Sequence, residues 1–311
     1  MASFPIEKKL VIAVSSSALF DLTQSHEVFD KLGPVEYKKF QEENLNTILN
    51  PGVAFPFVKR LLSLNERFAS DLPVEVVLLS RNSAATGRRV FRSIERYGLE
   101  ITRAAFTEGK SPYRYLPAFN SSLFLSAHED DVRAAIGAGF AAGQVLPTNI
   151  EDDELDTELR IAFDFDGVII DDESEAVFQS RSLSGFKSHE KQKLNIPHQP
   201  GPLAKLFKEL SVVQKLEDLR ANQQSDYKRI LRTAIVTARG APTHERVVTT
   251  LEHWGVSANE TFFLGGMEKA RVLNELKPHV FFDDQLGHLK NNGMNIPMVH
   301  IPFGIRNSKS D

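Results

Sequence analysis

Two aspartates, Asp164 and Asp166, stand two positions apart directly after the apolar run 159–163. If that run is a buried strand, both carboxylates lie just past its end and can face one site. One could attack as a nucleophile while the other exchanges a proton with a leaving group. A pair of acids after a strand is also common as a solvated turn, so this pair carries weight only together with other residues.

Three further groups of polar residues follow apolar runs downstream. Thr237 comes after residues 234–236 and offers a hydroxyl and backbone N–H groups for phosphate oxygens at the start of a helix. Lys269 offers a positive charge for the same phosphate and for an attacking carboxylate. Asp283 and Asp284 end the run 280–282. Taken singly, such a threonine is usually an N-cap, such a lysine a surface residue and such acids a turn.

The acids would repel one another and a phosphate unless a cation lies beside them. Asp164, Asp166, Asp283 and Asp284 are therefore the candidate metal ligands. Ligand sets made only of oxygen suit Mg²⁺, which proteins bind through a few carboxylates, water and substrate phosphate. The residues thus predict phosphoryl chemistry with Mg²⁺ as the cofactor.

Strands that alternate with helices would position these residues. Short runs that are apolar on both faces and are followed by turn residues and helical patterns are typical of a parallel sheet. The predicted strands are residues 10–14, 74–79, 123–125, 159–163, 232–236 and 280–282. Helices are predicted between them, as at 86–97 and 243–254, which Gly98 and Gly255 end. The pattern predicts an α/β fold whose ligands bind beyond the carboxyl ends of the strands.

The two halves of the chain repeat one another. At an offset of 149 residues, identical positions include 12–13 and 161–162, 28–29 and 177–178, 45–46 and 194–195, 51–52 and 200–201, and 59 and 208. At an offset of 157 they include 89–90 and 246–247, 95 and 252, 98 and 255, 106 and 263, 109 and 266, 116 and 273, and 124 and 281. The change of offset places an insertion in the polar stretch 215–228. Chance similarity explains shared periodicity, but not identities at Gly, Pro and Phe.

We therefore expect two related Rossmann-like units from an internal duplication, residues 1–150 and 151–311. Only the second copy carries the acids. The aligned pairs are Asp164 and Ser15, Asp166 and Ser17, Thr237 and Ser80, Lys269 and Pro112, and Asp283-Asp284 and Ser126-Ala127. The first unit is accordingly expected to be non-catalytic and the second catalytic.

The order D-x-D-G-V, hydrophobic-Thr, Lys and D-D resembles the four motifs of the haloacid dehalogenase superfamily of phosphatases. Strings from both halves resemble a narrower family, the cytosolic 5′-nucleotidases of type I. They are residues 13–16, 18–20, 51–52, 54–59, 125–127, 132–133, 161–164, 172–175, 201–203, 236–239 and 278–285. One departure is Phe165, where the vertebrate members have Gly, and the residues here are closer to the general superfamily motif.

This resemblance implies a Mg²⁺-dependent 5′-nucleotidase that hydrolyses nucleoside 5′-monophosphates to nucleoside and phosphate. Asp164 would attack phosphorus to give an aspartyl-phosphate. Asp166 would protonate the leaving 5′-oxygen and then activate water. Thr237 and Lys269 would hold the transferring group.

The resemblance also implies ligands for the metal and the substrate. Mg²⁺ would be held by Asp164 and Asp283 with the Asp166 carbonyl, and Asp284 would act directly or through a metal-bound water. Residues 171–231 are long enough for a small helical cap over the site. The implied substrate contacts are Asp172 and Glu175, in a charged run that opens this segment, together with Ala238 and Arg239. Without the resemblance, the charged run is interpreted equally well as the solvent-exposed start of a helix.

Composition narrows the possible partners. The net charge is −4 and no run of Lys or Arg is present, so nucleic-acid binding is not expected. The absence of cysteine fits a reducing compartment, and a cytoplasmic protein is expected. The apolar stretch that begins at Leu10 is broken by serines, so neither an export signal nor a membrane span is expected. Two other functions stay open: a phosphatase for other small phosphomonoesters, and a nucleotide-binding sensor without turnover.

Overall fold

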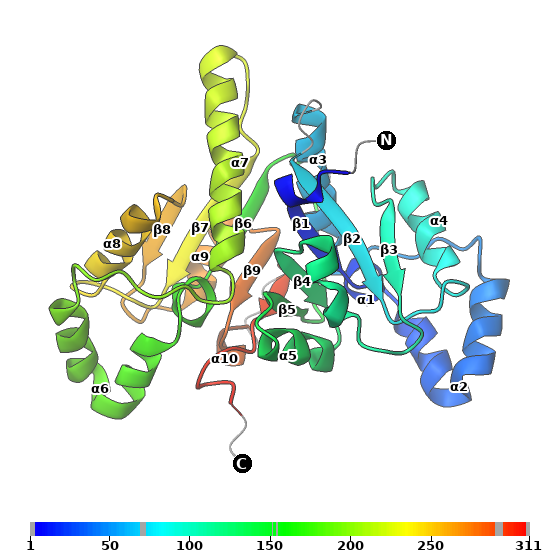
Figure 1. Ribbon diagram of the computed structural model, residues 1–311, viewed down its shortest axis with the longest axis horizontal. Helices are drawn as coiled ribbons and strands as arrows, with labels where there is room; N and C mark the ends of the chain where they lie inside the picture. The colour runs from blue at the N-terminus through cyan, green and yellow to red at the C-terminus, as the bar shows by residue number, and fades with distance from the viewer. Residues whose placement is uncertain (1–3, 69–72, 151, 154, 290–294, 309–311) are drawn as a thin grey trace. The chain divides into compact units, whose positions relative to one another are not determined.

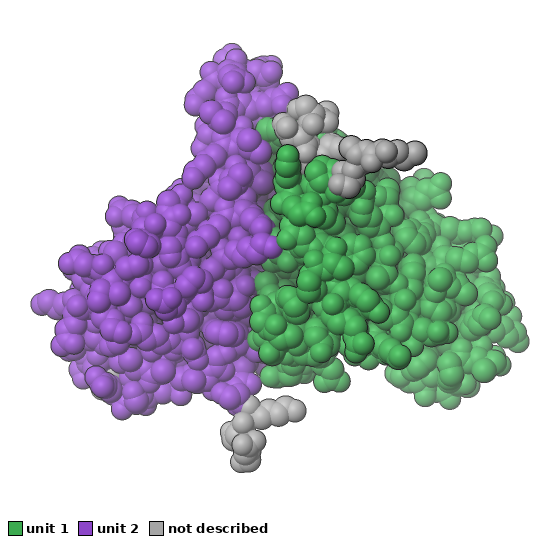
Figure 2. Space-filling view, in the orientation of Figure 1, with its two compact units in different colours: residues 1–147 green, residues 148–311 purple. Residues whose placement is uncertain are grey.

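The chain divides into two compact units, residues 1–147 and residues 148–311 (Figure 2). The computed structural model describes residues 4–68, 73–150, 152–153, 155–289 and 295–308. Each unit contains a parallel sheet whose strands are connected by helices (Figure 1). The protein therefore has the mixed α/β fold that the alternating pattern predicts. In the described ranges, no helix has both the length and the apolar character needed to cross a membrane.

In unit 1 the strands lie in the order β3-β2-β1-β4-β5, and neighbours are parallel. The strands are β1 Leu10–Val14, β2 Val74–Ser80, β3 Arg103–Phe106, β4 Leu123–Ser126 and β5 Ala142–Val145. The helices are α1 Ser16–Leu19, α2 Thr23–Glu43, α3 Phe55–Arg67, α4 Arg88–Arg96 and α5 Glu129–Gly137, with short 3₁₀ turns at Ile6–Lys8, Tyr113–Tyr115 and Pro117–Phe119. All residues of β1, β2 and β4 are buried, as expected for central strands covered on both faces.

In unit 2 the strands lie in the order β8-β7-β6-β9-β10, again with parallel neighbours. The strands are β6 Leu159–Phe163, β7 Leu231–Thr237, β8 Glu260–Phe263, β9 Val280–Asp283 and β10 Met298–His300. The helices are α6 Glu173–Gln192, α7 Ala204–Gln223, α8 His244–Trp254, α9 Lys269–Leu276 and α10 Leu286–Leu289, and a tight turn covers Phe165–Ile169. The core of this unit includes stacked rings of Phe163 and Phe282, with Phe207 edge-on to Phe163.

The strands predicted from apolar runs are all present, and their ends carry a detail that the pattern did not predict. Ser80, Ser126, Thr237 and Asp283 are the last residues of their strands instead of the first residues after them. The strands β3, β5, β8 and β10 were not predicted. They are three or four residues long, and partial burial weakens the apolar signal of β3 and β8, whereas β10 is buried throughout.

The two units share their strand order and a close backbone contact. Gly52 N donates to Leu19 O, and Gly201 N donates to Ile169 O, each at 2.9 Å. A Cβ on Gly201 would lie 2.1 Å from the Ile170 oxygen, and one on Gly52 would meet backbone atoms at 2.8 Å. Only glycine allows this approach. The glycines of the two Pro-Gly pairs are therefore required by the same backbone contact in both units.

The segment predicted as a cap consists of two helices with different surroundings. The first half of α7 packs on the sheet through Phe207, and Glu217 accepts hydrogen bonds from Ile230 N at 2.8 Å and Leu231 N at 3.0 Å. Its C-terminal part projects beyond the strands (Figure 1). Because α7 belongs to the layer on the sheet, α6 is left as the helix that could act as a cap. Unit 1 has α2 at the corresponding position, so this helix is not peculiar to the second unit.

Candidate active site

Asp164 lies at the carboxyl end of β6, where the pairing with β9 fixes its backbone. Asp164 N donates to Phe282 O at 2.8 Å, and the side chain accepts from Phe165 N at 2.7 Å. The residue is 4% exposed. Because β6 and β9 are parallel neighbours, this pairing brings Asp164 beside Asp283 at the end of β9.

Lys269, the first residue of α9, bridges these two acids. Its Nζ lies 2.9 Å from Asp164 Oδ2 and 2.7 Å from Asp283 Oδ2. Burial alone would lower the pKa of this lysine, but the two carboxylates raise it above its ordinary value. Lys269 is therefore a fixed cation at the junction of the two predicted catalytic strands.

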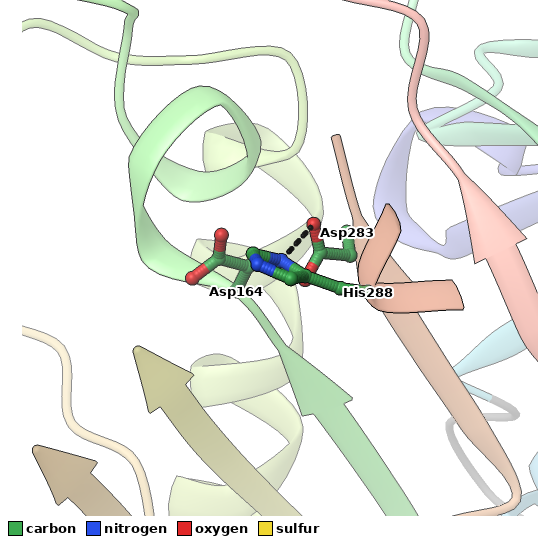
Figure 3. A group of neighbouring side chains, drawn as sticks. All are labelled: Asp164, Asp283 and His288. Carbon is green, nitrogen blue, oxygen red and sulfur yellow. Dashed lines mark hydrogen bonds and ion pairs between the residues drawn. The ribbon is translucent and has the colours of Figure 1, made fainter. Parts of the chain in front are cut away.

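Asp283 is fully buried and has a further partner that the sequence did not suggest. His288 Nδ1, on α10, lies 3.2 Å from Asp283 Oδ1 and 3.0 Å from Oδ2, and Gln285 N donates to Oδ1 at 2.8 Å. Burial opposes ionisation of Asp283, yet Lys269 and His288 hold its pKa below the ordinary value. Figure 3 shows the His288 ring against Asp283, with Asp164 alongside. Asp283 is thus an ionised acid held in one orientation.

The carboxyl group of Asp284 is buried, but within the described ranges few hydrogen bonds or opposite charges compensate for its burial. Its Oδ1 has no hydrogen-bond partner among the described residues. Burial, followed by the charges of Asp164 and Asp283, raises the pKa of Asp284 to about 9. Gly167 lies against this carboxyl group: its φ is 70°, and a Cβ there would lie 2.8 Å from the Asp284 Cγ. The glycine of the D-x-D-G-V motif is therefore required by the position of Asp284 as well as by its own backbone.

The electrostatics of this cluster favour an additional cation. Burial and the neighbouring acids Asp283 and Asp166 raise the pKa of Asp164 to about 7, although Lys269 lowers it. One lysine faces three buried carboxyl groups, Asp164, Asp283 and Asp284, and one carboxylate oxygen lacks a partner. A divalent ion would supply the missing positive charge, and oxygen donors suit Mg²⁺. The residues present therefore fit the predicted metal.

The described residues contain two groupings with metal-ligand spacing. Asp164, Asp283 and His288 present one ligand atom each within 4.8 Å of one another. The other grouping is Asp171, Glu173 and His198. In that grouping Glu173 already pairs with Lys193 and Arg246, which, despite burial, lower its pKa to about 2. A cation there would face two positive side chains, whereas the first grouping faces one among the described residues, Lys269, beside the strand-end acids, so the first grouping is the better candidate metal site.

Asp166 points to a different partner from the other predicted acids. Arg239 Nε donates to Asp166 Oδ2 at 2.8 Å, and Arg239 Nη2 donates to Oδ1 at 2.7 Å. This two-point contact occupies both carboxylate oxygens in the geometry that makes such pairs strong. The same guanidinium donates to Glu190 and to Ser174 Oγ, so Arg239 joins Asp166 to helix α6.

Thr237 is the last residue of β7 and is buried. Its Oγ1 accepts from Arg239 N at 3.2 Å, which fixes the start of the loop after β7. Ala238, between these two residues, is exposed. The loop therefore leaves Ala238 exposed and turns the Arg239 side chain inward.

The two acids predicted as substrate contacts bind a loop of unit 2. Asp172 Oδ2 accepts from Ile305 N at 2.8 Å, and Glu175 Oε1 accepts from Arg306 Nε at 2.7 Å. Asp172 also lies against Gly304, whose φ is 76°. These contacts join the start of α6 to the segment after β10, and the structure records none between these acids and Asp164 or Thr237.

Sequence reasoning missed His288, Glu190, Ser174 and Arg246. Glu190 and Arg246 lie inside helical patterns, where a charged residue ordinarily indicates a solvated face, and each is at most 2% exposed. The repeat holds the signal that could have found them. Glu190 aligns with Gln41 and His288 with Asp131, so a polar residue stands at each position in both copies.

The fold and the strand-end acids define a Rossmann-like α/β protein compatible with the haloacid dehalogenase superfamily. A model of the 5′-nucleotidase family matches residues 2–308, and the chain belongs to that family. The chain is 35% identical over 290 residues to the human protein named cytosolic 5′-nucleotidase 1B. That match covers 90% of this chain and 47% of the relative, so the chain spans about half the length of the curated relative it matches. The predicted family is confirmed.

Proposed function

We propose that this protein is a Mg²⁺-dependent 5′-nucleotidase that hydrolyses nucleoside 5′-monophosphates. The observation that carries the proposal is the Asp164–Lys269–Asp283 cluster at the carboxyl ends of β6 and β9, in a chain of the 5′-nucleotidase family. The cluster combines a buried carboxylate, a fixed cation and a second acid, which are the parts that phosphoryl transfer through a covalent intermediate requires.

In the first step, Asp164 attacks phosphorus. A bond forms between its carboxylate oxygen and phosphorus while the bond from phosphorus to the 5′-oxygen breaks. Asp166 gives a proton to that departing oxygen. The products are an aspartyl-phosphate and the nucleoside. In the second step Asp166 takes a proton from water, the water oxygen attacks phosphorus, and Asp164 is released with free phosphate.

Lys269 and Thr237 hold the transferring group. Lys269 already contacts Asp164 and can share its charge with a phosphate oxygen beside that carboxylate. Thr237 offers its hydroxyl and the backbone beyond it. Asp164 and Asp283, the Asp166 carbonyl and Asp284 would hold Mg²⁺, which when bound neutralises the acids and the substrate phosphate. His288 would orient Asp283.

The proposed substrate contacts divide into two kinds. Ala238 is exposed beside Thr237 and would face the substrate with its backbone. Arg239, Asp172 and Glu175 already have partners in unit 2, and they would act on the substrate by fixing α6 and the loop after β7. Residues 1–147 would be a non-catalytic copy of the same unit, and its serines in place of aspartates support this role.

The substrate partner in this proposal is a nucleoside monophosphate, with no nucleic acid or membrane partner. The cytoplasm is the proposed location. The name of the human relative, the absence of cysteine and the net charge of −4 support these assignments.

Phosphate release from AMP, IMP, CMP, UMP and deoxynucleotides, with Mg²⁺ and with EDTA, tests the proposal. We expect turnover that requires Mg²⁺ and is faster on nucleotides than on sugar phosphates. Faster turnover of sugar phosphates would favour the general phosphatase. Nucleotide binding without phosphate release would favour the sensor.

A further inference from the structure

We propose that Arg239, fixed by Glu190 of helix α6, is a positioning residue that holds the Asp166 carboxylate where it can exchange a proton with the 5′-oxygen. This inference rests on the proposed function. It makes the orientation of Asp166 dependent on α6, although α6 contributes no side chain to the Asp164 cluster.

Asp166 needs an external support because of its place in the chain. It lies in the turn after β6, directly before Gly167 with its φ of 70°, and its side chain is 21% exposed. A partly exposed carboxylate in a turn would sample several rotamers. The forked Arg239 guanidinium binds both carboxylate oxygens and thereby selects one rotamer of Asp166. Each carboxylate oxygen keeps a second lone-pair direction, so the fork leaves room for a proton on the other side.

Arg239 is itself held from the opposite side. Its Nη1 donates to Glu190 Oε2, and its Nη2 donates to Ser174 Oγ at 2.8 Å. Glu190 also accepts from Arg246 Nη1 at 3.0 Å and from Ser174 Oγ at 3.0 Å. The Arg239 side chain is 2% exposed and that of Glu190 is 1% exposed. A guanidinium so enclosed has little freedom to leave Asp166 for a substrate.

Unit 1 provides an internal control for the alternative that Arg239 and Glu190 only stabilise the fold. Gln41 stands where unit 2 has Glu190, and it keeps the bond to the helix serine, donating to Ser25 Oγ at 2.9 Å. Asn82 stands where unit 2 has Arg239. The same helix and loop are therefore held without the ion pair in the unit that lacks the aspartates. The charges occur together with Asp166, which points to a role in its placement.

The test compares AMP, whose leaving oxygen needs a proton, with p-nitrophenyl phosphate, whose leaving group does not. We expect Arg239→Ala to lower kcat on AMP by about 10²-fold with KM little changed, because a misplaced catalytic group costs about that much. The loss on p-nitrophenyl phosphate should be smaller, and added guanidinium should restore part of the AMP activity. Equal losses on both substrates without rescue would overturn the proposal.

Two further variants separate positioning from folding. In an Asp166→Asn background, Arg239→Ala should cost little more activity, because the group that Arg239 positions is already disabled. Additive losses would contradict the proposal. If Arg239→Ala does not fold, Arg239→Lys carries the test: its single ammonium cannot bind both oxygens as a fork, so the same difference between substrates is expected.

Arg160→Ala is the matched control. Arg160 also binds two acids of unit 2, Asp156 at 2.6 Å and Glu158 at 2.9 Å, but it lies on β6 before the site. Its loss should lower Tm and leave kcat on both substrates unchanged. A wild-type protein that releases no phosphate from AMP or from any other nucleotide of the panel above would refute the proposed function, and a nucleotide of that panel that is hydrolysed would replace AMP in this test. If the wild-type protein releases phosphate and Arg239→Ala matches it on both substrates, only the proposed role of Arg239 is refuted.

Discussion

The ends of β4 and β9 carry the same turn built with different residues. Ser126 Oγ accepts from His128 N at 3.1 Å, and Asp283 Oδ1 accepts from Gln285 N at 2.8 Å. The carboxylate has a second oxygen, which binds Lys269, whereas the serine hydroxyl has none to spare for a cation. One substitution thus preserves the turn and adds or removes a charged ligand.

Where β1 and β6 end, the aligned side chains also accept a backbone hydrogen bond, from the third residue along in unit 1 and from the next residue in unit 2. Ser15 accepts from Ala18 N at 3.1 Å, and Asp164 accepts from Phe165 N at 2.7 Å, so both close the turn after their strand. Elsewhere the units share bonds residue for residue: Arg89 Nε donates to Thr47 O, and Arg246 Nε donates to Ile196 O, both at 2.8 Å. The difference teaches that this scaffold is maintained by bonds that do not require the acids. The acids predicted to carry the chemistry stand at the strand ends of unit 2.

Replacing Asp164 should produce the largest effect. Asp164→Asn keeps the shape of the side chain but cannot attack phosphorus, so we expect phosphate release from AMP to fall by at least about 10³-fold. Ser15→Asn, at the matching position of unit 1, should leave kcat unchanged. Measurable turnover close to that of the wild type in Asp164→Asn would remove this residue from the nucleophile role.

Replacing Asp283 should change the metal requirement more than the fold. EDTA is expected to stop phosphate release and Mg²⁺ to restore it. Asp283→Ala removes an anionic oxygen and one partner of Lys269, so the Mg²⁺ concentration at half-maximal activity should rise by about tenfold or more. Mg²⁺ titration of kcat for both proteins measures this. An unchanged requirement would transfer the ligand role to Asp284.

Asp284 should make the stability of the metal-free protein depend on pH. Its pKa is raised from 3.8 to about 9 in the folded protein, so between these values the folded state holds a proton that the unfolded state has released. The free energy of unfolding therefore falls as pH rises through this window. Asp284→Asn should flatten the fall, and Mg²⁺ should restore the wild type at high pH. Thermal unfolding of both proteins in EDTA across this pH range measures the effect. If stability falls with pH equally steeply in Asp284→Asn and in the wild type, Asp284 is not responsible.

The sequence predicted six of the ten described strands and most of the strand-end residues, because both leave local signals. The run 159–163 is apolar on both faces, and the acids follow it at once. The contact of Arg239 with Asp166 and Glu190 joins three separate parts of the chain, so no local pattern indicates it. Family resemblance singled out Arg239 as a substrate contact, and only the fold shows that its side chain faces Asp166.

The smallest expected effect concerns Ser126 in unit 1. Ser126→Ala removes the buried hydroxyl that accepts from His128 N and leaves the backbone of a partly buried turn without that partner. The expected cost is about 1 kcal/mol, which corresponds to a fall in Tm of about 2–4 °C. Because unit 1 lacks the acids of a metal site, kcat and the Mg²⁺ requirement should match the wild type, in contrast to Asp283→Ala. Thermal unfolding measures the change in Tm, and Mg²⁺ titration of the same preparation measures kcat and the Mg²⁺ requirement. A raised Mg²⁺ requirement in Ser126→Ala would show that unit 1 contributes to the metal site.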